Sequence, residues 1–214
     1  MPAHAFHLLR KFAWRQNKGA EALLQRTGSL GRPILVTGAA GFVGSRLIPA
    51  LREAHPERPV VGVARNAAKG RSDAYVDLSD RGATAELIAA FRPSHIFHLA
   101  GYASAGKARK NPMDAWRDNR DASFCLGEAI AQHAPDATVL MASTVEVYGE
   151  SLRLGPASET TRPLPKGVYA TSKLAGEQML LATLPPSAKL IIKRPANHTG
   201  AGQMDDFVVA SFAK

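Results

Sequence analysis

The sequence contains almost no cysteine: Cys125 is the only one in 214 residues. A single thiol excludes an internal disulfide bond and supplies no cysteine cluster for a metal. Long apolar runs are missing too, since none approaches the ~20 residues of a membrane-spanning helix. We therefore expect a protein of the cytoplasm, with no metal site and no membrane partner, in which Cys125 is a buried thiol within a helix.

Acidic residues are scarce relative to basic ones: 18 Asp and Glu face 27 Lys and Arg, which gives a formal net charge of +9. Residues 1–32 carry +5 of this charge, because they hold six basic residues and Glu21 alone. The rest of the chain is mildly basic, which suits an anionic cofactor or substrate. It contains no zinc finger, basic zipper or aromatic-basic RNA motif, so we expect no nucleic-acid partner.

Residues 1–31 form a basic N-terminal extension. Apolar residues between Phe6 and Ala13 would share one face of a short helix. This composition fits a mitochondrial presequence, an accessory helix, or an upstream extension from a wrongly assigned start. We exclude this extension from the fold and treat residues 32–214 as one domain.

Apolar runs of strand length alternate with segments of helical periodicity from Pro33 onward. Strands are predicted at residues 34–37, 59–64, 74–76, 95–100, 138–143 and 189–194. Helices are predicted at residues 42–54, 81–91, 112–133 and 168–183. Apolar strands that alternate with helices favour a parallel sheet covered on both faces. The predicted fold class is therefore α/β, a doubly wound parallel sheet of the Rossmann type.

The first predicted strand ends at a glycine-rich turn with the spacing G-x-x-G-x-x-G, formed by Gly38, Gly41 and Gly44. A helix that follows such a turn aims free N–H groups and the positive end of its dipole at one point, where a pyrophosphate can bind. Gly38 suits the sharp turn, Gly41 lets phosphates approach, and Gly44 lets the helix pack close to the strand. The spacing predicts a dinucleotide site; the alternative is a βα turn with no ligand.

The residues after the second and third strands indicate which cofactor binds, because ligands of such folds lie across the carboxyl ends of the strands. Arg65 stands where an NAD site favours an acidic residue, and it can pair with a 2′-phosphate, which favours NADP(H) over NAD(H). The alternative is an exposed arginine at a strand end. Asp77 can accept a hydrogen bond from the adenine amino group and Leu78 can pack on the ring, although Asp77 also suits a turn.

The fourth predicted strand ends in small residues. Leu99, Ala100 and Gly101 leave room for the backbone to pass close to a cofactor. His95 and His98 lie within the same strand. We interpret both histidines as hydrogen-bonded core residues, because no carboxylate or cysteine accompanies them in a metal-ligand pattern.

Acid-base chemistry is indicated after the fifth strand. Ser143 and Thr144 end this strand, and Tyr169 and Lys173 lie four residues apart on one face of the next helix. An ammonium near a phenol favours the phenolate and lowers a pKa that starts at about 10. Such a shift makes Tyr169 an acid or base near neutral pH.

Several motifs occur in one order along residues 33–214 and together resemble one known family. They are the run from Thr37 to Gly44, Asp77-Leu78, Leu99-Ala100-Gly101, Ser143-Thr144-x-Glu146, Tyr169-x-x-x-Lys173 and Arg194-Pro195-x-Asn197-His198. The sequence is identified as a member of the extended short-chain dehydrogenase/reductases, the NAD-dependent epimerase/dehydratase family. Within this family, the segment from Asn197 to Gln203 is most similar to the branch of GDP-mannose 4,6-dehydratase and GDP-4-keto-6-deoxymannose reductase.

The resemblance implies roles for single residues. Cofactor binding is implied for Gly38, Gly41, Phe42, Val43, Gly44, Arg65, Asp77, Leu78, Leu99, Ala100, Gly101, Tyr169, Lys173 and Pro195. Catalytic roles are implied for Thr144, Tyr169, Lys173, Glu146 and Asn119. Tyr169 would transfer a proton, Thr144 would hydrogen-bond the same substrate oxygen, and Lys173 would bind the nicotinamide ribose and lower the tyrosine pKa. Asn197 would help to seat the substrate diphosphate.

The implied function is an oxidoreductase that acts at C4 of a nucleotide-diphosphate sugar, with a GDP-4-keto-6-deoxyhexose reductase favoured. A 4,6-dehydratase or a 4-epimerase stays open, because Glu146 would serve a dehydratase as an extra acid-base group but also fits an exposed loop carboxylate. A non-catalytic dinucleotide-binding sensor is the alternative of another class. The presence of Thr144, Tyr169 and Lys173 together favours the enzyme.

The family's substrate domain continues beyond the point that matches Lys214. We therefore expect a fragment that carries only the start of the substrate-binding region, with the substrate domain largely absent, and a homodimer for the full-length form. Ala196 and Ala201 stand where the branch has an aromatic residue and a proline, which leaves the identity of the sugar open.

Overall fold

A computed structural model describes residues 24, 30–66, 72–203 and 212. They form one six-stranded parallel sheet with the strand order β3-β2-β1-β4-β5-β6. The strands are β1 (Ile34–Thr37), β2 (Val60–Ala64), β3 (Ala74–Tyr75), β4 (His95–His98), β5 (Thr138–Ala142) and β6 (Lys189–Lys193). Apart from positions 24, 30 and 31, the predicted N-terminal extension lies outside the described residues.

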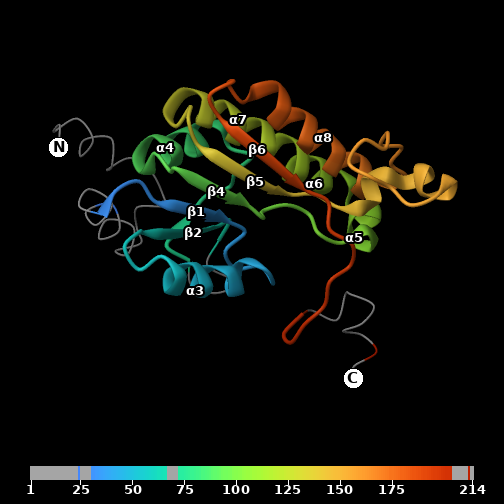
Figure 1. The fold of residues 1–214 in the computed structure, drawn as a ribbon, viewed down its shortest axis with the longest axis horizontal. Helices are drawn as coiled ribbons and strands as arrows, with labels where there is room; N and C mark the ends of the chain where they lie inside the picture. The colour runs from blue at the N-terminus through green and yellow to red at the C-terminus, as the bar shows by residue number, and fades with distance from the viewer. Residues whose placement is uncertain (1–23, 25–29, 67–71, 204–211, 213–214) are drawn as a thin grey trace.

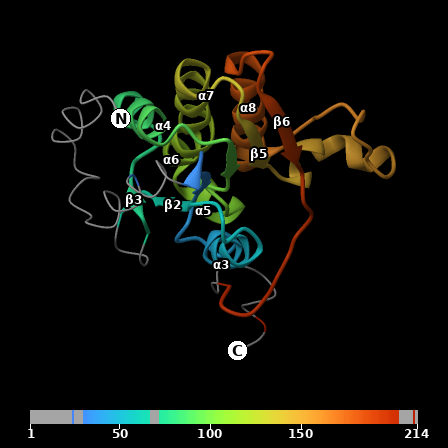
Figure 2. The same ribbon diagram turned by 60° about the vertical axis from the view of Figure 1, so that its left-hand side comes forward.

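Helices lie on both faces of this sheet. They are α3 (Gly44–Ala54), α4 (Arg81–Phe91), α5 (Ala105–Lys110), α6 (Pro112–Trp116), the π-helix η3 (Arg117–Asp121), α7 (Ala122–His133), the 3-10 helix η4 (Val145–Leu154) and α8 (Gly167–Thr183). α3 packs on one face against β1 and β2, while α4, α7 and α8 lie on the other face (Figures 1 and 2). The strand order and the parallel pairing are those of a Rossmann-type fold, which confirms the predicted fold class.

The core explains why the predicted strands are apolar throughout. β1 is buried at all four residues, because it pairs with β2 on one side and β4 on the other. Its side chains alternate between two apolar clusters. Leu35 belongs to the cluster that includes α4 and α7, whereas Ile34 and Val36 pack with Ile48 of α3. A central strand of a doubly covered sheet is therefore buried at every position, and three of the four residues of β1 are apolar.

The edge strand β6 differs from the expectation of burial on both faces. Its residues alternate between half-buried and exposed, and Ile191 is 44% exposed. α3 packs against β1 and β2, and in the sheet β4 and β5 separate these two strands from β6. Within the described part of the chain, one face of β6 is therefore open.

The helix predicted over residues 112–133 is interrupted. α6 ends at Trp116, five residues form the π-helix η3, and α7 continues from Ala122. The wider π-helical turn directs Asp118 and Asn119 inward, and both side chains are buried. A single widened turn hardly changes the apolar periodicity, so the sequence pattern did not reveal it. The short helices α5 and η4 were not predicted either.

Candidate active site

Most predicted site residues meet at the carboxyl ends of β1, β4 and β5, which are neighbours in the sheet. The glycine turn follows β1, Gly101 follows β4, and Thr144 follows β5. α8 adds Tyr169 and Lys173 from the side. The strand order reverses direction between β1 and β4, and this is the place where open α/β sheets bind ligands.

The glycine turn is confined by backbone on several sides. Gly38 has φ +70°, and a Cβ there would lie 2.8 Å from the amide nitrogen of Ala100. A Cβ on Gly44 would overlap the carbonyl oxygen of Gly38, so α3 begins in close contact with the turn. The N–H groups of Phe42 and Val43 donate to no acceptor within the described residues. These features fit an anion such as a pyrophosphate at the start of α3.

Gly101 lets two polar side chains approach the end of β4. It has φ +150°, and a Cβ there would lie 2.7 Å from Asn119 Oδ1 and 3.0 Å from Lys173 Nζ. The amide N–H of the preceding residue, Ala100, donates to Thr37 Oγ1 at 3.1 Å and ties β4 to β1. The small residues predicted to pass close to a cofactor thus also make room for Lys173. Their contact with a cofactor, and that of Leu99, stay predictions.

Asn119 fixes the segment after β4 to α8. Its side chain is 2% exposed, Oδ1 accepts a hydrogen bond from the Tyr102 amide at 2.8 Å, and Nδ2 donates to Ser172 Oγ at 2.9 Å. The Ser172 hydroxyl in turn donates to the carbonyl oxygen of Tyr169 at 2.9 Å. Asn119 therefore holds the helix turn that carries Tyr169 and Lys173.

Lys173 is buried beneath the strand ends, with 6% of the residue exposed. Its ammonium donates to the carbonyl oxygen of Ala142, at the end of β5, over 3.0 Å. Burial lowers the pKa of Lys173 to about 8, although the nearby Glu177 carboxylate acts in the opposite direction. A lysine with this pKa is still largely an ammonium at neutral pH.

Tyr169 lies next to Thr144, as the predicted acid-base site requires. The Thr144 hydroxyl hydrogen-bonds the Tyr169 phenol and favours the phenolate. Burial has the larger effect, and together with the charge of Glu146 it raises the pKa of Tyr169 above its usual value. The prediction that Lys173 lowers this pKa is therefore wrong for the chain without a ligand. The lysine shares the helix face, but its ammonium is directed to the Ala142 carbonyl.

Glu146 stands at the start of η4, beside Tyr169. The residue is exposed, which matches its alternative interpretation as a loop carboxylate. Partial burial of its carboxyl group nevertheless raises the pKa of Glu146. A carboxyl group whose pKa is raised, and which lies near a candidate acid-base tyrosine, has the properties of a second proton carrier.

The two histidines of β4 differ. His98 is buried, with Nδ1 2.9 Å from Thr37 Oγ1 and Nε2 3.3 Å from Ser123 Oγ, so its interpretation as a core residue is confirmed. Burial and the charge of Lys173 lower the pKa of His98 to about 3. His95 is hydrogen-bonded but exposed, at the opposite end of the strand, so it is not a core residue.

Arg65 is engaged by carboxylates at the end of β2. Its guanidinium lies 2.6 Å from Asp118 Oδ2 and 3.9 Å from Asp77 Oδ2. Asp77 accepts hydrogen bonds from the amide and hydroxyl of Ser79, so it is a turn residue. Burial acts to raise the pKa of Asp77, but these bonds and Arg65 outweigh burial and lower it. Leu78 is buried in the core, which leaves less of its side chain for an adenine ring.

The segment after β6 runs beside the strand ends. The Pro195 carbonyl oxygen accepts a hydrogen bond from the Val145 amide at 2.9 Å, which places Pro195 next to the Thr144 segment. Asn197 is exposed, and the His198 ring stacks on Phe42 of the glycine turn at 6.1 Å between centroids. This stack joins the segment after β6 to the glycine turn and was not predicted.

Sequence reasoning also missed Asp118 and a buried cluster around Glu177. Glu177 is fully buried on α8 and contacts Ser143 and Arg194. The available signal was its position one helical turn after Lys173, where a charged residue falls on the inward face of α8.

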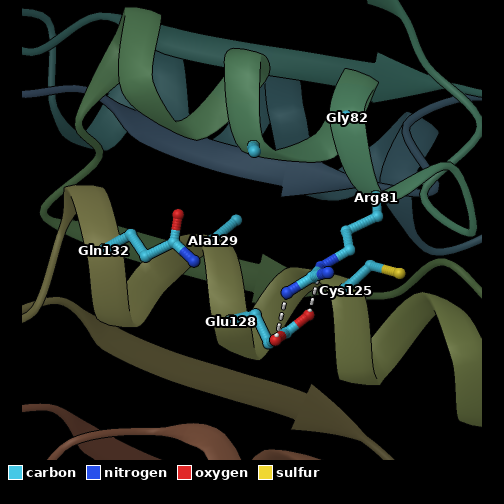
Figure 3. Close-up of a pocket in the computed structure, with 7 residues that line it drawn as sticks. Arg81, Gly82, Cys125, Glu128, Ala129 and Gln132 are labelled. Carbon is cyan, nitrogen blue, oxygen red and sulfur yellow. Dashed lines mark hydrogen bonds and ion pairs between the residues drawn. The ribbon is translucent and has the colours of Figure 1, made fainter.

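A separate pocket of about 300 Å³ lies between α4 and α7, lined by Arg81, Gly82, Ala85, Cys125, Glu128, Ala129 and Gln132 (Figure 3). Arg81 and Glu128 form an ion pair at 2.8 Å across it. None of the predicted site residues lines this pocket. Cys125, which does line it, has the predicted buried thiol.

Residues 30–66 and 72–203 contain neither a metal-binding cluster of His, Cys, Asp or Glu nor a helix fit to cross a membrane.

Comparisons with known proteins agree with this geometry. Residues 34–214 match the model of the NAD dependent epimerase/dehydratase family. The chain is 32% identical over 183 residues to a GDP-6-deoxy-D-mannose reductase of Pseudomonas aeruginosa, covering 85% of this chain and 57% of the reductase.

Solved structures of similar fold include two complexes with NAD. One is the UDP-glucose 4-epimerase of Thermus thermophilus, with a TM-score of 0.70, 30% identity, and coverage of 81% of this chain and 58% of that one. The other is MoeE5 in complex with UDP-glucose and NAD, with a TM-score of 0.69, 31% identity, and coverage of 84% and 59%. The chain spans about half the length of the curated relatives it matches.

Proposed function

Because the chain belongs to the NAD dependent epimerase/dehydratase family, we propose that it is an NAD(P)-dependent oxidoreductase that acts at C4 of a nucleotide-diphosphate sugar. Among the reactions of this kind, we propose reduction of a GDP-4-keto-6-deoxyhexose. The similarity to a GDP-6-deoxy-D-mannose reductase supports this choice. Similarity to UDP-glucose 4-epimerases supports the broader class of nucleotide-sugar substrates and keeps epimerisation as an alternative.

One observation carries the proposal: Thr144, Tyr169 and Lys173 gather beside the glycine turn, although the strand end and the helix are separate in the sequence. A sensor that only binds a dinucleotide needs no phenol in contact with a hydroxyl, next to a buried ammonium. Perturbed ionisable groups in a crevice are typical of catalytic sites.

Separate residues of this chain would bind the cofactor, orient the sugar and transfer the proton. A bound nicotinamide dinucleotide would supply or accept the hydride. The turn from Gly38 to Gly44 would hold the pyrophosphate, with the amides of Phe42 and Val43 as donors. Thr144 would orient the C4 oxygen of the sugar, and Tyr169 would give that oxygen a proton during reduction or take one during oxidation.

Lys173 would contribute its charge. At neutral pH the buried Lys173 is an ammonium one helical turn from Tyr169 on α8, and it would stabilise the phenolate once the proton has left. In the chain without ligands this ammonium is bonded to Ala142. A ribose hydroxyl at the same place would accept from Lys173 as the carbonyl does. Pro195 and Asn197, on the segment beside Thr144, are proposed to contact the nicotinamide amide and the substrate diphosphate.

The preference for NADP(H) over NAD(H) is a proposal that rests on Arg65. Its guanidinium lies at the carboxyl end of β2, where the adenosine ribose would be expected. Asp118 and Asp77 hold it there. A 2′-phosphate would have to compete with these two carboxylates, so the preference should be moderate.

We also propose a homodimer in the cytoplasm. Phe124 of α7 and Leu181 of α8 are exposed apolar residues on two helices that pack side by side, which suits a surface shared between copies. The single free and buried cysteine suits a reducing compartment.

Mass spectrometry of products separates these reactions. The full-length form is incubated with the reduced cofactor (NADPH or NADH) or the oxidised cofactor (NADP+ or NAD+) and a panel of GDP-, UDP- and dTDP-linked sugars. A reductase adds two hydrogen atoms to a 4-keto sugar, a dehydratase removes water, and an epimerase leaves the mass unchanged but alters the chromatographic retention. We expect reduction of GDP-4-keto-6-deoxymannose with oxidation of the cofactor. Cofactor binding with no change in any sugar would favour the sensor.

A further inference from the structure

A buried carboxylate lies beneath the candidate active site and has no role in the proposed chemistry. Glu177 is 0% exposed on α8, one turn beyond Lys173. Ser143 Oγ donates to its Oε1. Arg194, directly after β6, donates from Nε to Oε1 at 3.0 Å and from its terminal nitrogen to Oε2 at 2.6 Å. One carboxylate therefore ties α8 to the ends of both β5 and β6.

Each partner of Glu177 is the neighbour in sequence of a proposed site residue. Ser143 precedes Thr144, and Arg194 precedes Pro195. The two strand ends are also joined through their backbones, since the Ser143 amide donates to the Lys193 carbonyl at 2.8 Å. A shift of the carboxylate would therefore move both segments together.

The Glu177 cluster also reaches η4. The Arg194 guanidinium carbon lies 4.9 Å from the centre of the buried Tyr148 ring. This contact braces the segment that follows Thr144 and contains Glu146. A charged network in which the carboxylate is fully buried and paired holds its members in one arrangement, because a break leaves a buried charge without a partner.

We propose that Glu177 is a positioning residue of the candidate active site: its carboxylate holds Ser143 and Arg194, and through them the segments that carry Thr144 and Pro195. The inference rests on the proposed function in one respect, that Thr144 acts together with Tyr169. The contact between these two side chains can be measured without cofactor or substrate, so a failure of the network and a failure of the proposed function are distinguishable.

Electrostatics support the same role. The charge of Glu177 opposes the effect of burial on Lys173 and so helps to keep the lysine protonated. The charge of Lys173 also acts on His98 from β4, whose imidazole is uncharged at neutral pH. Glu146 from η4 is the charged group that acts on Tyr169 from another element.

The first test uses Ser143→Ala, which removes one hydrogen bond and leaves the ion pair of Glu177 with Arg194 in place. The full chain is labelled with 3-fluorotyrosine, and the Tyr169 signal among the four tyrosines is assigned with Tyr169→Phe. The hydrogen bond from Thr144 lowers the Tyr169 pKa, so loosening Thr144 should raise the titration midpoint of this signal. Ser187→Ala, which removes an exposed hydrogen bond to Pro135, is the matched control and should leave the midpoint unchanged.

The second test uses Glu177→Gln with lysine labelled with ¹³C. Loss of the carboxylate charge should shift the Lys173 titration midpoint down from about 8, whereas Glu53→Gln on the exposed part of α3 should not move it. A purely structural role for Glu177 would lower stability but leave the Tyr169 midpoint where it is. If Glu177→Gln does not fold, Ser143→Ala decides alone. An unchanged Tyr169 midpoint in folded Ser143→Ala overturns the proposal, and so does an unchanged Lys173 midpoint in folded Glu177→Gln.

Discussion

Replacing Gly38 with alanine tests whether the glycine turn is as confined as the structure indicates. At φ +70° an alanine is strained by about 1–2 kcal/mol. Its Cβ would also lie 2.8 Å from the Ala100 nitrogen, which is backbone and cannot turn aside as a flexible side chain can. Overpacking of this kind costs typically about 1–3 kcal/mol. We expect the free energy of unfolding to fall by about 2–5 kcal/mol.

Gly31 provides the matched control. It has φ +86°, but a Cβ there would meet nothing within 4 Å among the residues that the structure describes. Gly31→Ala should therefore show the backbone strain alone, about 1–2 kcal/mol. Both variants restrict the unfolded chain equally, so the difference between them isolates the steric contact. Equilibrium urea unfolding followed by circular dichroism gives both values. Equal losses for the two variants would refute the argument that Gly38 is required by close packing against β4.

Three further predictions concern charge. As pH falls below about 6.5, His98 takes up a proton in the unfolded chain but not in the folded chain, where its pKa is about 3. The free energy of unfolding should therefore fall by up to about 1.4 kcal/mol per pH unit, and it should fall less steeply in His98→Gln. Parallel urea-unfolding profiles for the two proteins would contradict this. Arg65→Asp should weaken NADPH binding and leave NADH binding unchanged or stronger, as fluorescence titration can measure; an unaltered NADPH affinity removes the proposed preference. Glu177→Gln should lower the free energy of unfolding by about 3–5 kcal/mol, because Arg194 is left without its partner. The control Glu53→Gln should lower it by about 0.5 kcal/mol or less. Similar losses for both would mean that the ion pair does not stabilise the fold.

The sheet was predictable because burial of a strand or a helix face produces a recognisable pattern of apolar residues in the sequence. Strands such as β1, covered on both faces, are mainly apolar without alternation, and the helices between them keep a 3.6-residue period. The glycine turn was visible for a related reason, since Gly38 and Gly44 stand where the backbone leaves no room for a Cβ. The strand pattern, the helix pattern and the glycine spacing are each visible in residues near one another in the sequence, although the backbone that confines Gly38 belongs to Leu99 and Ala100.

Features that depend on tertiary contacts were not predictable. The spacing of Tyr169 and Lys173 placed both on one helix face, but the direction of the ammonium depends on the Ala142 carbonyl at the end of a distant strand. The pairing of Arg65 with Asp118 depends on a π-helical turn that has no distinct sequence pattern. Glu177 was visible only as a carboxylate on an apolar helix face, and its partners come from two strand ends.

The proposed reaction requires that Tyr169 transfers a proton beside a bound nicotinamide. Comparison of Tyr169→Phe with the parent protein tests it most directly, because the phenylalanine keeps the ring and removes only the hydroxyl. In the full-length form, with NADPH and GDP-4-keto-6-deoxymannose, we expect hydride transfer to slow by about 10²–10⁴-fold, while the affinity for NADPH stays nearly unchanged. Hydride transfer at the parent rate in Tyr169→Phe would contradict the assignment of Tyr169 as the proton donor.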